Sequence, residues 1–427
     1  MTLGISVAEI VEKSDNPLLR IHPSWQRVRL DTVAEILNGF AFESSRFTKS
    51  EGIPLLRIRD IGKNATEAFY SGSYDEAYFV ELEDLVIGMD GDFNCARWRG
   101  PRALLNQRVC KVTVTSPEYN SKFLEFVLPG YLKAINDHTS SVTVKHLSSK
   151  TVGEIPLPCP PMPEQERIVA RLEELLSDLE AGVAALKRVR AGTKRYKVSV
   201  LKAACEGKLF GNKEIENGEL PEGWRWATVK ELADGSKNAL KAGPFGSSLK
   251  KEYYAPKGYK IYGQEQVIRG DPNFGDYYID EDRYQQLKSN AVKPGDILIS
   301  LVGTIGKVLI LPENIEPGII NPRLVKLSLD RNLIDSNYFK FYMGTEIAKH
   351  YFSTVSHGET MKILNLGILK SLPIPLPPLE EQRRIVAEVE RRLESMRAVE
   401  AAVEVGLKRA GRLRQAVLRS AFEGRLT

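Results

Sequence analysis

The chain has 427 residues, of which 42% are apolar and 27% charged, and no apolar run is long enough to cross a bilayer. This composition is that of an ordinary globular protein, and the length allows two to four domains. The net charge of +5, from 60 basic and 55 acidic residues, is compatible with a nucleic-acid partner but does not require one.

Residues 1–24 are interpreted as an N-terminal extension, which mixes acids and bases and has no basic-then-apolar signal sequence. The chain contains four cysteines, none with the C-x-x-C spacing of a metal or redox site. We therefore expect free thiols, a cytoplasmic protein and no bound metal. The four cysteines are Cys95, Cys110, Cys159 and Cys205.

Residues 25–153 are predicted to form a first α+β domain. Short β-branched or aromatic runs, bounded by Gly, Pro, Asn and Asp, begin at Pro54, Asp84 and Arg108. An amphipathic pattern over 119–137 predicts one helix that closes the domain.

A helical segment over 154–210 follows, beginning with the proline-rich run PLPCPPMP, which must be extended and cannot be helical. Acidic residues at the start of the helix favour the positive end of its dipole, and Gly207 is placed to end it. About 43 residues lie between, or ~65 Å of helix at 1.5 Å per residue.

Residues 211–370 resemble the first mixed segment and are predicted to form a second α+β domain. Strand-like runs begin at Tyr259, Asp296, Lys307 and Leu324, and one closing helix is expected over 336–354. The C-terminal segment 371–427 again reads as a proline run followed by one long helix ending near Gly424.

The two helical segments are copies of one another. Residues 155–210 and 372–427 align without a gap at an offset of 217, and 22 of the 56 pairs are identical. The two mixed segments also align, more loosely, with Trp25 matching Trp224. The chain is therefore an internal duplication of an α+β domain followed by a long helix.

Apolar residues recur in both predicted helices at the spacing of a coiled-coil seam. The seam residues are Ile168, Leu172, Leu175, Leu179, Leu186, Val189, Tyr196, Val200, Ile385, Val389, Met396, Val399, Val403, Leu413 and Val417.

Charge predicts the direction in which the two helices pair. In the first helix, 164–180 has six acids and two bases, whereas 187–208 has eight bases and one acid; the second helix repeats this gradient. Antiparallel pairing places acidic halves against basic halves, and parallel pairing would oppose like charges. We expect an antiparallel coiled coil separating two α+β domains related by a pseudo-two-fold axis. The alternative is that each helix packs only on its own domain and the gradient serves the helix dipole.

Paired PLPPxxEQxxIV…EG[KR]L segments, each after a strand-rich domain, resemble the specificity subunit of type I restriction–modification systems. The resemblance covers the chain from about residue 25 onward. It implies that each α+β domain is a target recognition domain for one half of a split, asymmetric DNA sequence. It also implies that the helices set the gap and dock two modification subunits, which restriction subunits join. Those modification subunits would hold S-adenosylmethionine and methylate adenine N6, so this chain would be non-catalytic and bind no cofactor.

Base edges are read by Arg or Lys at guanine and by Asn or Gln at adenine, beside residues that hold phosphates. Such residues cluster in the runs RIRD and NCARWRGPR of the first domain, and in GSSLKK and GQEQVIR of the second. Equivalent basic residues of the two copies suit contact with the DNA backbone, and equally a structural role. The predicted DNA-binding residues are Arg57, Arg59, Asn94, Arg97, Trp98, Arg99, Arg102, Arg108, Lys145, Ser247, Ser248, Lys250, Lys251, Gln264, Gln266, Arg269, Arg323 and Lys362. For each of them a solvated surface charge is an equally good interpretation.

No catalytic motif is found. The run GTIGKV at 303–308 lacks the earlier glycine and the final Ser or Thr of a phosphate-binding loop. The five histidines are scattered, and paired aspartates lie in turn-like stretches. Two other classes remain as alternatives: a protein-only scaffold, which salt-dependent DNA affinity would argue against, and a self-contained nuclease, which divalent-ion-dependent cleavage would reveal.

Overall fold

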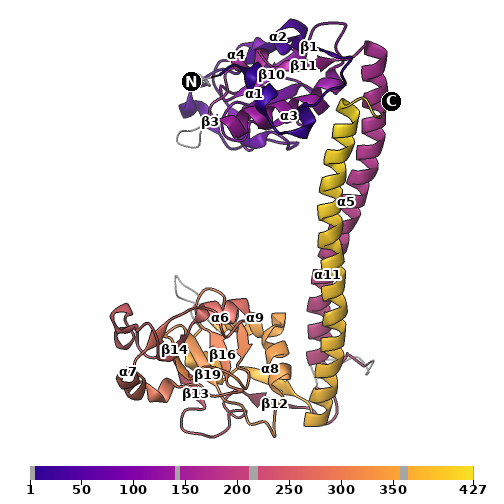
Figure 1. Cartoon of the computed structure of the whole chain (residues 1–427). Helices are drawn as coiled ribbons and strands as arrows, with labels where there is room; N and C mark the ends of the chain where they lie inside the picture. Colours follow the sequence, from indigo (N-terminus) through magenta and orange to yellow (C-terminus); the bar gives the residue numbers. More distant parts are fainter. Residues whose placement is uncertain (1–4, 140–144, 211–219, 356–363, 427) are drawn as a thin grey trace. The chain divides into compact units, whose positions relative to one another are not determined.

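The computed structural model describes residues 5–139, 145–210, 220–355 and 364–426. The chain forms two compact units, one of 1–186 with 405–427 and one of 187–404. Each unit contains one α+β domain, half of one long helix and half of the other (Figure 1). The boundary between the units falls within both long helices.

The N-terminal extension is part of the first domain. Helix α1 (Val7–Lys13) begins at a capping box, in which the Ser6 hydroxyl accepts from the Glu9 amide and the Glu9 carboxylate accepts from the Ser6 amide. Its apolar face is buried in the first core, so α1 is held by tertiary packing.

Within the described residues, three sheets build the first domain. Strand β1 (Gln26–Arg29) pairs antiparallel with β11 (Pro156–Cys159). An antiparallel sheet follows in the order β2 (Ala34–Asn38), β10 (Val109–Val114), β7 (Leu85–Gly88) and β8 (Cys95–Arg97). A smaller sheet has the order β3 (Phe47–Thr48), β5 (Phe69–Tyr70), β4 (Ile53–Leu56), β9 (Ala103–Leu105) and β6 (Phe79–Val80), with β4 and β9 parallel.

Helices α2 (Leu30–Val33), α3 (Ser121–His138) and α4 (Ser149–Gly153) complete the first domain. Helix α3 is the predicted closing helix and buries nine residues. Its apolar face shares one core with α1, with the start of α5 (Met162–Cys205) and with the end of α11 (Leu379–Phe422).

The second domain repeats this plan. Strand β12 (Arg225–Thr228) pairs with β20 (Pro373–Leu376), and an antiparallel sheet has the order β13 (Leu240–Ala242), β19 (Leu324–Leu327), β16 (Ile297–Ser300) and β17 (Val308–Ile310). The third sheet has the order β15 (Tyr278–Ile279), β14 (Tyr259–Tyr262) and β18 (Gly318–Ile320), with β14 and β18 parallel. The remaining helices are α6 (Gln264–Arg269), α7 (Glu281–Gln286), α8 (Ser336–Met343), α9 (Glu346–Val355) and α10 (Leu366–Lys370).

The single closing helix expected over 336–354 is two helices. The amide of Gly344 closes α8 on the carbonyl groups of its last turn, and the buried Thr345 accepts a hydrogen bond from Ala348 at 3.3 Å to start α9. A buried Thr that can cap a helix offers the backbone an alternative to continuing it.

The long helices α5 and α11 pair antiparallel, which confirms the prediction from charge. In the first unit Arg414 of α11 lies 3.3 Å from Glu180 of α5. In the second unit Lys197 and Arg190 of α5 lie 2.6 and 3.4 Å from Glu400 and Glu404 of α11. The hydrogen bond from Lys197 is the main cause that lowers the pKa of Glu400.

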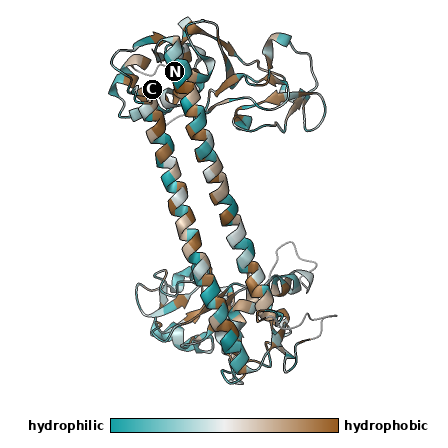
Figure 2. Ribbon diagram, turned by 90° about the vertical axis from the view of Figure 1, so that its right-hand side faces the viewer, coloured by the Kyte–Doolittle hydropathy of each residue, from teal (hydrophilic) through white to brown (hydrophobic). Residues whose placement is uncertain are grey.

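The seam between the helices follows a different register from the predicted one beyond Leu186. Val189, Tyr196 and Leu413 are 40–50% exposed, so their assignment to the seam was wrong. The positions that face the partner helix continue from Leu186 through Thr193, which is buried, and Lys197 to Val200. Thr193 contacts Glu400 of the partner helix through a hydrogen bond and Lys197 through an ion pair, so apolar spacing alone misses these positions. Figure 2 shows hydrophilic positions along both helices.

The other predicted seam residues are at least partly buried. Ile168, Leu172, Val200, Ile385, Val389 and Val403 are buried, and Leu175, Leu179, Leu186, Met396, Val399 and Val417 are half-buried. Gly406 allows close approach, because a Cβ there would lie 3.0 Å from Leu186 Cδ1. Along the described residues, no helix combines the length and apolar character that a membrane crossing requires.

Candidate nucleic-acid interface

A buried glutamine joins each long helix to its domain. Gln165 accepts from the Asn120 amide at 2.8 Å and donates to the carbonyl oxygens of Glu118 and Pro160 at 2.9 and 2.8 Å. Gln165 is fully buried and makes these bonds at the point where α3 begins. The glutamine of the repeated EQ motif therefore fixes the orientation of the first domain on α5.

The second copy makes the same joint. Gln382 accepts from the Asp335 amide at 2.8 Å and donates to Leu333 and Pro377. The preceding glutamate of each motif accepts from a tryptophan indole, Glu164 from Trp25 at 3.2 Å and Glu381 from Trp224 at 3.1 Å. Such a repeated joint holds the loops of each domain at a fixed place relative to its helix.

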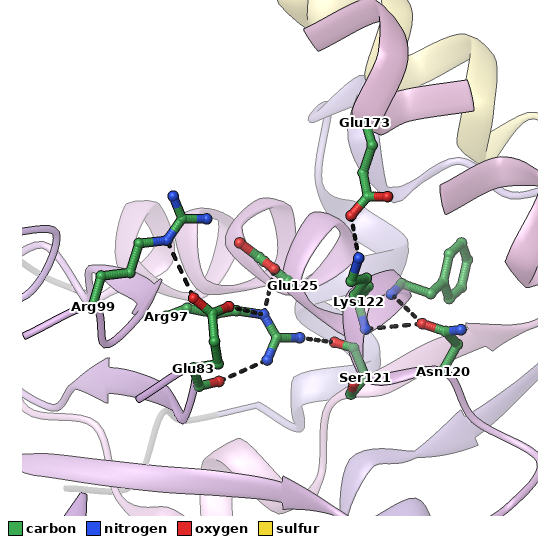
Figure 3. A network of polar contacts seen from close by, with 9 residues as sticks. Glu83, Arg97, Arg99, Asn120, Ser121, Lys122, Glu125 and Glu173 are labelled. Atoms are coloured by element: carbon green, nitrogen blue, oxygen red, sulfur yellow. Dashed lines mark hydrogen bonds and ion pairs between the residues drawn. The ribbon is translucent and has the colours of Figure 1, made fainter. Parts of the chain in front are cut away.

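The loop after β8 is anchored to α3 through Arg97 (Figure 3). The Arg97 guanidinium lies 2.6 Å from the Glu125 carboxylate and donates to the carbonyl oxygens of Glu83 and Ser121 at 2.7 and 2.9 Å. Its side chain is 11% exposed. Lys122, one residue beyond Ser121, reaches Glu173 of α5 at 2.6 Å. Arg97 thus positions the loop and is not free to contact a base.

Three further predicted DNA-binding residues have structural roles. Trp98 is 1% exposed because its ring packs in the core with residues of β7 and β9. Its indole N–H donates to the Pro101 carbonyl. Gln266 is 3% exposed and binds the Gly263 amide and the Phe274 carbonyl. Lys145 donates to the carbonyl and side-chain oxygens of Asn136 at the end of α3. Sequence composition cannot tell a buried polar group from an exposed one.

Three exposed cations of the first domain are paired with acids. Arg99 lies 3.6 Å from Glu83, Arg102 lies 2.6 Å from Glu81, and Arg108 lies 3.3 Å from Asp90. Surface pairs of this kind contribute roughly 0–1 kcal/mol, so a phosphate group can displace the carboxylates.

Two other side chains of the RIRD run differ in their surroundings. Arg57 lies 3.9 Å from the buried Asp60, whose carboxylate also accepts from the Arg57 amide. Arg59 is exposed, as is Asn94, which directly precedes β8. Among the residues predicted to contact bases in this domain, Arg59 and Asn94 therefore have accessible side chains. Arg59 forms no ion pair within the described residues.

The second domain leaves more of its cations unpaired. Lys251, Arg269 and Arg323 are exposed and form no ion pair within the described residues, although Arg269 lies 4.0 Å from the centre of the Phe274 ring. Lys250 lies 3.5 Å from Glu252. Unpaired basic groups on short, well-anchored segments are suited to DNA phosphates and guanine edges.

The remaining predicted residues of the second domain are mixed. Ser247 is exposed, whereas the Ser248 carbonyl accepts from Arg283 at 2.5 Å. The side-chain amide of Gln264 donates to the Ser300 hydroxyl at 2.9 Å and to the Val302 carbonyl. Its amide N–H groups are therefore engaged within the domain. Lys362 lies outside the described residues.

In the described part of the chain no three His, Cys, Asp or Glu residues gather as a metal site. Burial raises the pKa of the Cys110 thiol to about 12 and raises those of Cys95 and Cys205 further, so these groups stay protonated and weakly nucleophilic. The geometry provides anchored, basic, solvent-facing loops, which can bind a polyanion.

Comparison with known proteins gives a consistent result. A family model described as the type I restriction modification DNA specificity domain matches residues 23–187 and 221–397. The chain is 36% identical to the type I restriction enzyme EcoBI specificity subunit of Escherichia coli over all of this chain and 91% of that protein. It is 22% identical to the MjaVIII specificity subunit of Methanocaldococcus jannaschii over 93% of this chain and 91% of that protein.

Solved structures show the same fold. A chain from a structure of a type I restriction–modification system gives a TM-score of 0.65 at 21% identity, covering 95% of this chain and 99% of that chain. The HsdS subunit of Thermoanaerobacter tengcongensis gives a TM-score of 0.50 at 20% identity, covering 95% and 98%.

Proposed function

The chain belongs to the family of type I restriction modification DNA specificity domains, and on this premise we propose that it selects the DNA target of a type I restriction–modification complex. Each α+β domain reads one half of a bipartite sequence on double-stranded DNA. The exposed loops of the two domains differ in residue type and in charge pairing, so the two half-sites differ and the target is asymmetric.

The main support for the proposal is that a buried glutamine links each α+β domain to the start of its long helix, in the same way in both copies. Gln165 and Gln382 fix each domain at the start of a helix of 44 residues. Two antiparallel helices of ~66 Å each, at 1.5 Å per residue, then act as a spacer for the gap between half-sites.

The exposed faces of α5 and α11 dock two modification subunits, and restriction subunits complete the nuclease. Adenine N6 methylation uses S-adenosylmethionine held by the modification subunits, so this chain directs catalysis without performing it. The four cysteines are free thiols, which supports a cytoplasmic complex.

The proposal is tested by mapping adenine N6 methylation in a host that otherwise lacks it. The modification subunit is expressed with and without this chain, and genomic DNA is read by single-molecule sequencing. We expect methylation at one bipartite asymmetric motif only when both are present. Methylation that is independent of this chain, or absent although both proteins co-purify, would favour a protein-only scaffold.

A further inference from the structure

The loop between β13 and η6 (Lys251–Tyr253) of the second domain presents a phenylalanine to solvent. Phe245 is 87% exposed, whereas Phe42, which precedes the corresponding Ser-Ser pair of the first domain, is 6% exposed. Burial of such a ring is favourable relative to its exposure to water. Single exposed apolar residues are common on protein surfaces, and Phe245 is set apart by its anchoring and by the charge around it.

The loop that carries Phe245 is anchored on both sides. Before it, the Gly243 amide donates to the Leu324 carbonyl at 2.9 Å, and a Cβ at Gly243 would lie 1.9 Å from the Asn321 carbonyl oxygen. After it, the Ser248 carbonyl accepts from Arg283, whose guanidinium stacks 3.9 Å from the Tyr253 ring centre. Phe245 is therefore displayed by a fixed turn.

The charge around Phe245 indicates the chemistry of the partner. Residues 236–251 contain four lysines and no acid, and the next residue, Glu252, lies 3.5 Å from Lys250. The corresponding residues 33–48 contain two glutamates and one arginine. Arg323 is exposed two residues beyond Asn321, against which Gly243 packs. An exposed aromatic ring within a basic segment matches DNA, where phosphates flank a stack of apolar base faces.

The first domain lacks this combination. Phe42 packs 4.8 Å from the Tyr70 ring centre and 5.1 Å from that of Phe40. The nearby Phe40 is 46% exposed, but it lies between Glu35 and Glu43. A largely exposed ring within a purely basic segment thus occurs in only one of the two corresponding loops, which points to a role specific to one half-site.

We propose that Phe245 is an apolar wedge that stacks on a base step of the half-site bound by the second domain, with Lys250 and Lys251 on the flanking phosphates. The inference rests on the proposed DNA-specificity function and adds a specificity-determining residue to it. Because the energy of unstacking depends on the base step, Phe245 favours a flexible pyrimidine–purine step without a hydrogen bond to a base.

The test uses the full chain with its modification subunits on duplexes that carry the methylated motif, with 2-aminopurine placed at successive positions of each half-site. The modification subunits flip the methylated adenine of each half-site out of the stack, so those two positions are set aside. Beyond them, we expect wild type to raise 2-aminopurine fluorescence at one step of the half-site bound by the second domain. Phe245→Ala abolishes that rise and weakens binding about tenfold with an unchanged salt slope, as expected when one base is no longer stacked on the ring. Phe245→Trp restores both, and Trp226→Ala, a 53% exposed aromatic on β12, serves as the control.

The lysines provide the complementary measurement. Lys250→Ala and Lys251→Ala lower the salt slope by about 0.9 for each phosphate that is no longer neutralised, and they leave the 2-aminopurine signal in place. Wild-type affinity and fluorescence in Phe245→Ala overturn the inference, as does failure of that variant to bind the modification subunits while its DNA affinity is intact. Absence of sequence-specific binding by wild type would instead refute the proposed function.

Discussion

At the residue scale, the repeated EQ motif acts through burial. Glutamine is long enough to reach two carbonyl groups and one amide from the helix start, and Gln165 and Gln382 use the same three kinds of partner. The glutamates beside them hold the indole groups of Trp25 and Trp224. The motif is therefore a joint, and the residues that face DNA lie elsewhere.

Replacing Gln165 by Leu should destabilise the first unit by about 1–3 kcal/mol, because the Asn120 amide and two carbonyl groups are left without their partner. Urea unfolding with hydrogen exchange of α3 measures the effect. Glu166→Ala, one residue along on the exposed side of α5, is the matched control. Equal stability of the two variants would show that the joint does not stabilise the unit.

At the element scale, the end of α11 belongs to the core of the first unit. Leu418, Ala421 and Phe422 are buried with α3, and the Phe422 ring meets Phe123 edge to face at 6.3 Å. The His22 amide also donates to the Phe422 carbonyl at 3.1 Å. The last turns of the chain therefore complete a domain that begins near its first residues.

We expect Phe422→Ala to destabilise the first unit by about 3–5 kcal/mol through the cavity it leaves. Leu413→Ala, at a residue that is 50% exposed, should change stability by less than about 0.5 kcal/mol. Hydrogen exchange of β10 reports the first unit separately from the second. Comparable destabilisation by both variants would mean that Leu413 lies in the seam after all.

At the scale of the whole molecule, the antiparallel helices continue one seam from Leu172 to Val200 in steps of four and three residues. A heptad inserted after Leu186 and another before Gly406 preserves that seam and lengthens each helix by ~10 Å. If the helices are the spacer, the gap between methylated half-sites should grow by about three base pairs at 3.4 Å each.

Methylation mapping measures this gap directly. A heptad in α5 alone mismatches the two helices and serves as the control, because it should abolish methylation at the bipartite motif. An unchanged gap with both heptads present would contradict the spacer role.

The sequence by itself determined the duplication, the α+β and helical elements, and the antiparallel sense of pairing. These three features follow from local composition, periodicity and charge, which do not depend on how the chain folds. It also located the loops that carry exposed Arg59, Arg99 and Arg323.

Only the tertiary structure decided which polar residues face inward. Arg97, Trp98 and Gln266 have the chemistry of DNA-binding residues, yet their partners come from distant segments that composition does not reveal. The sequence did not reveal the seam beyond Leu186, because Thr193 and Lys197 are polar. It did not reveal the exposure of Phe245, because most phenylalanines in folded proteins are buried. Burial depends on what the fold places opposite each side chain, and that information is not local.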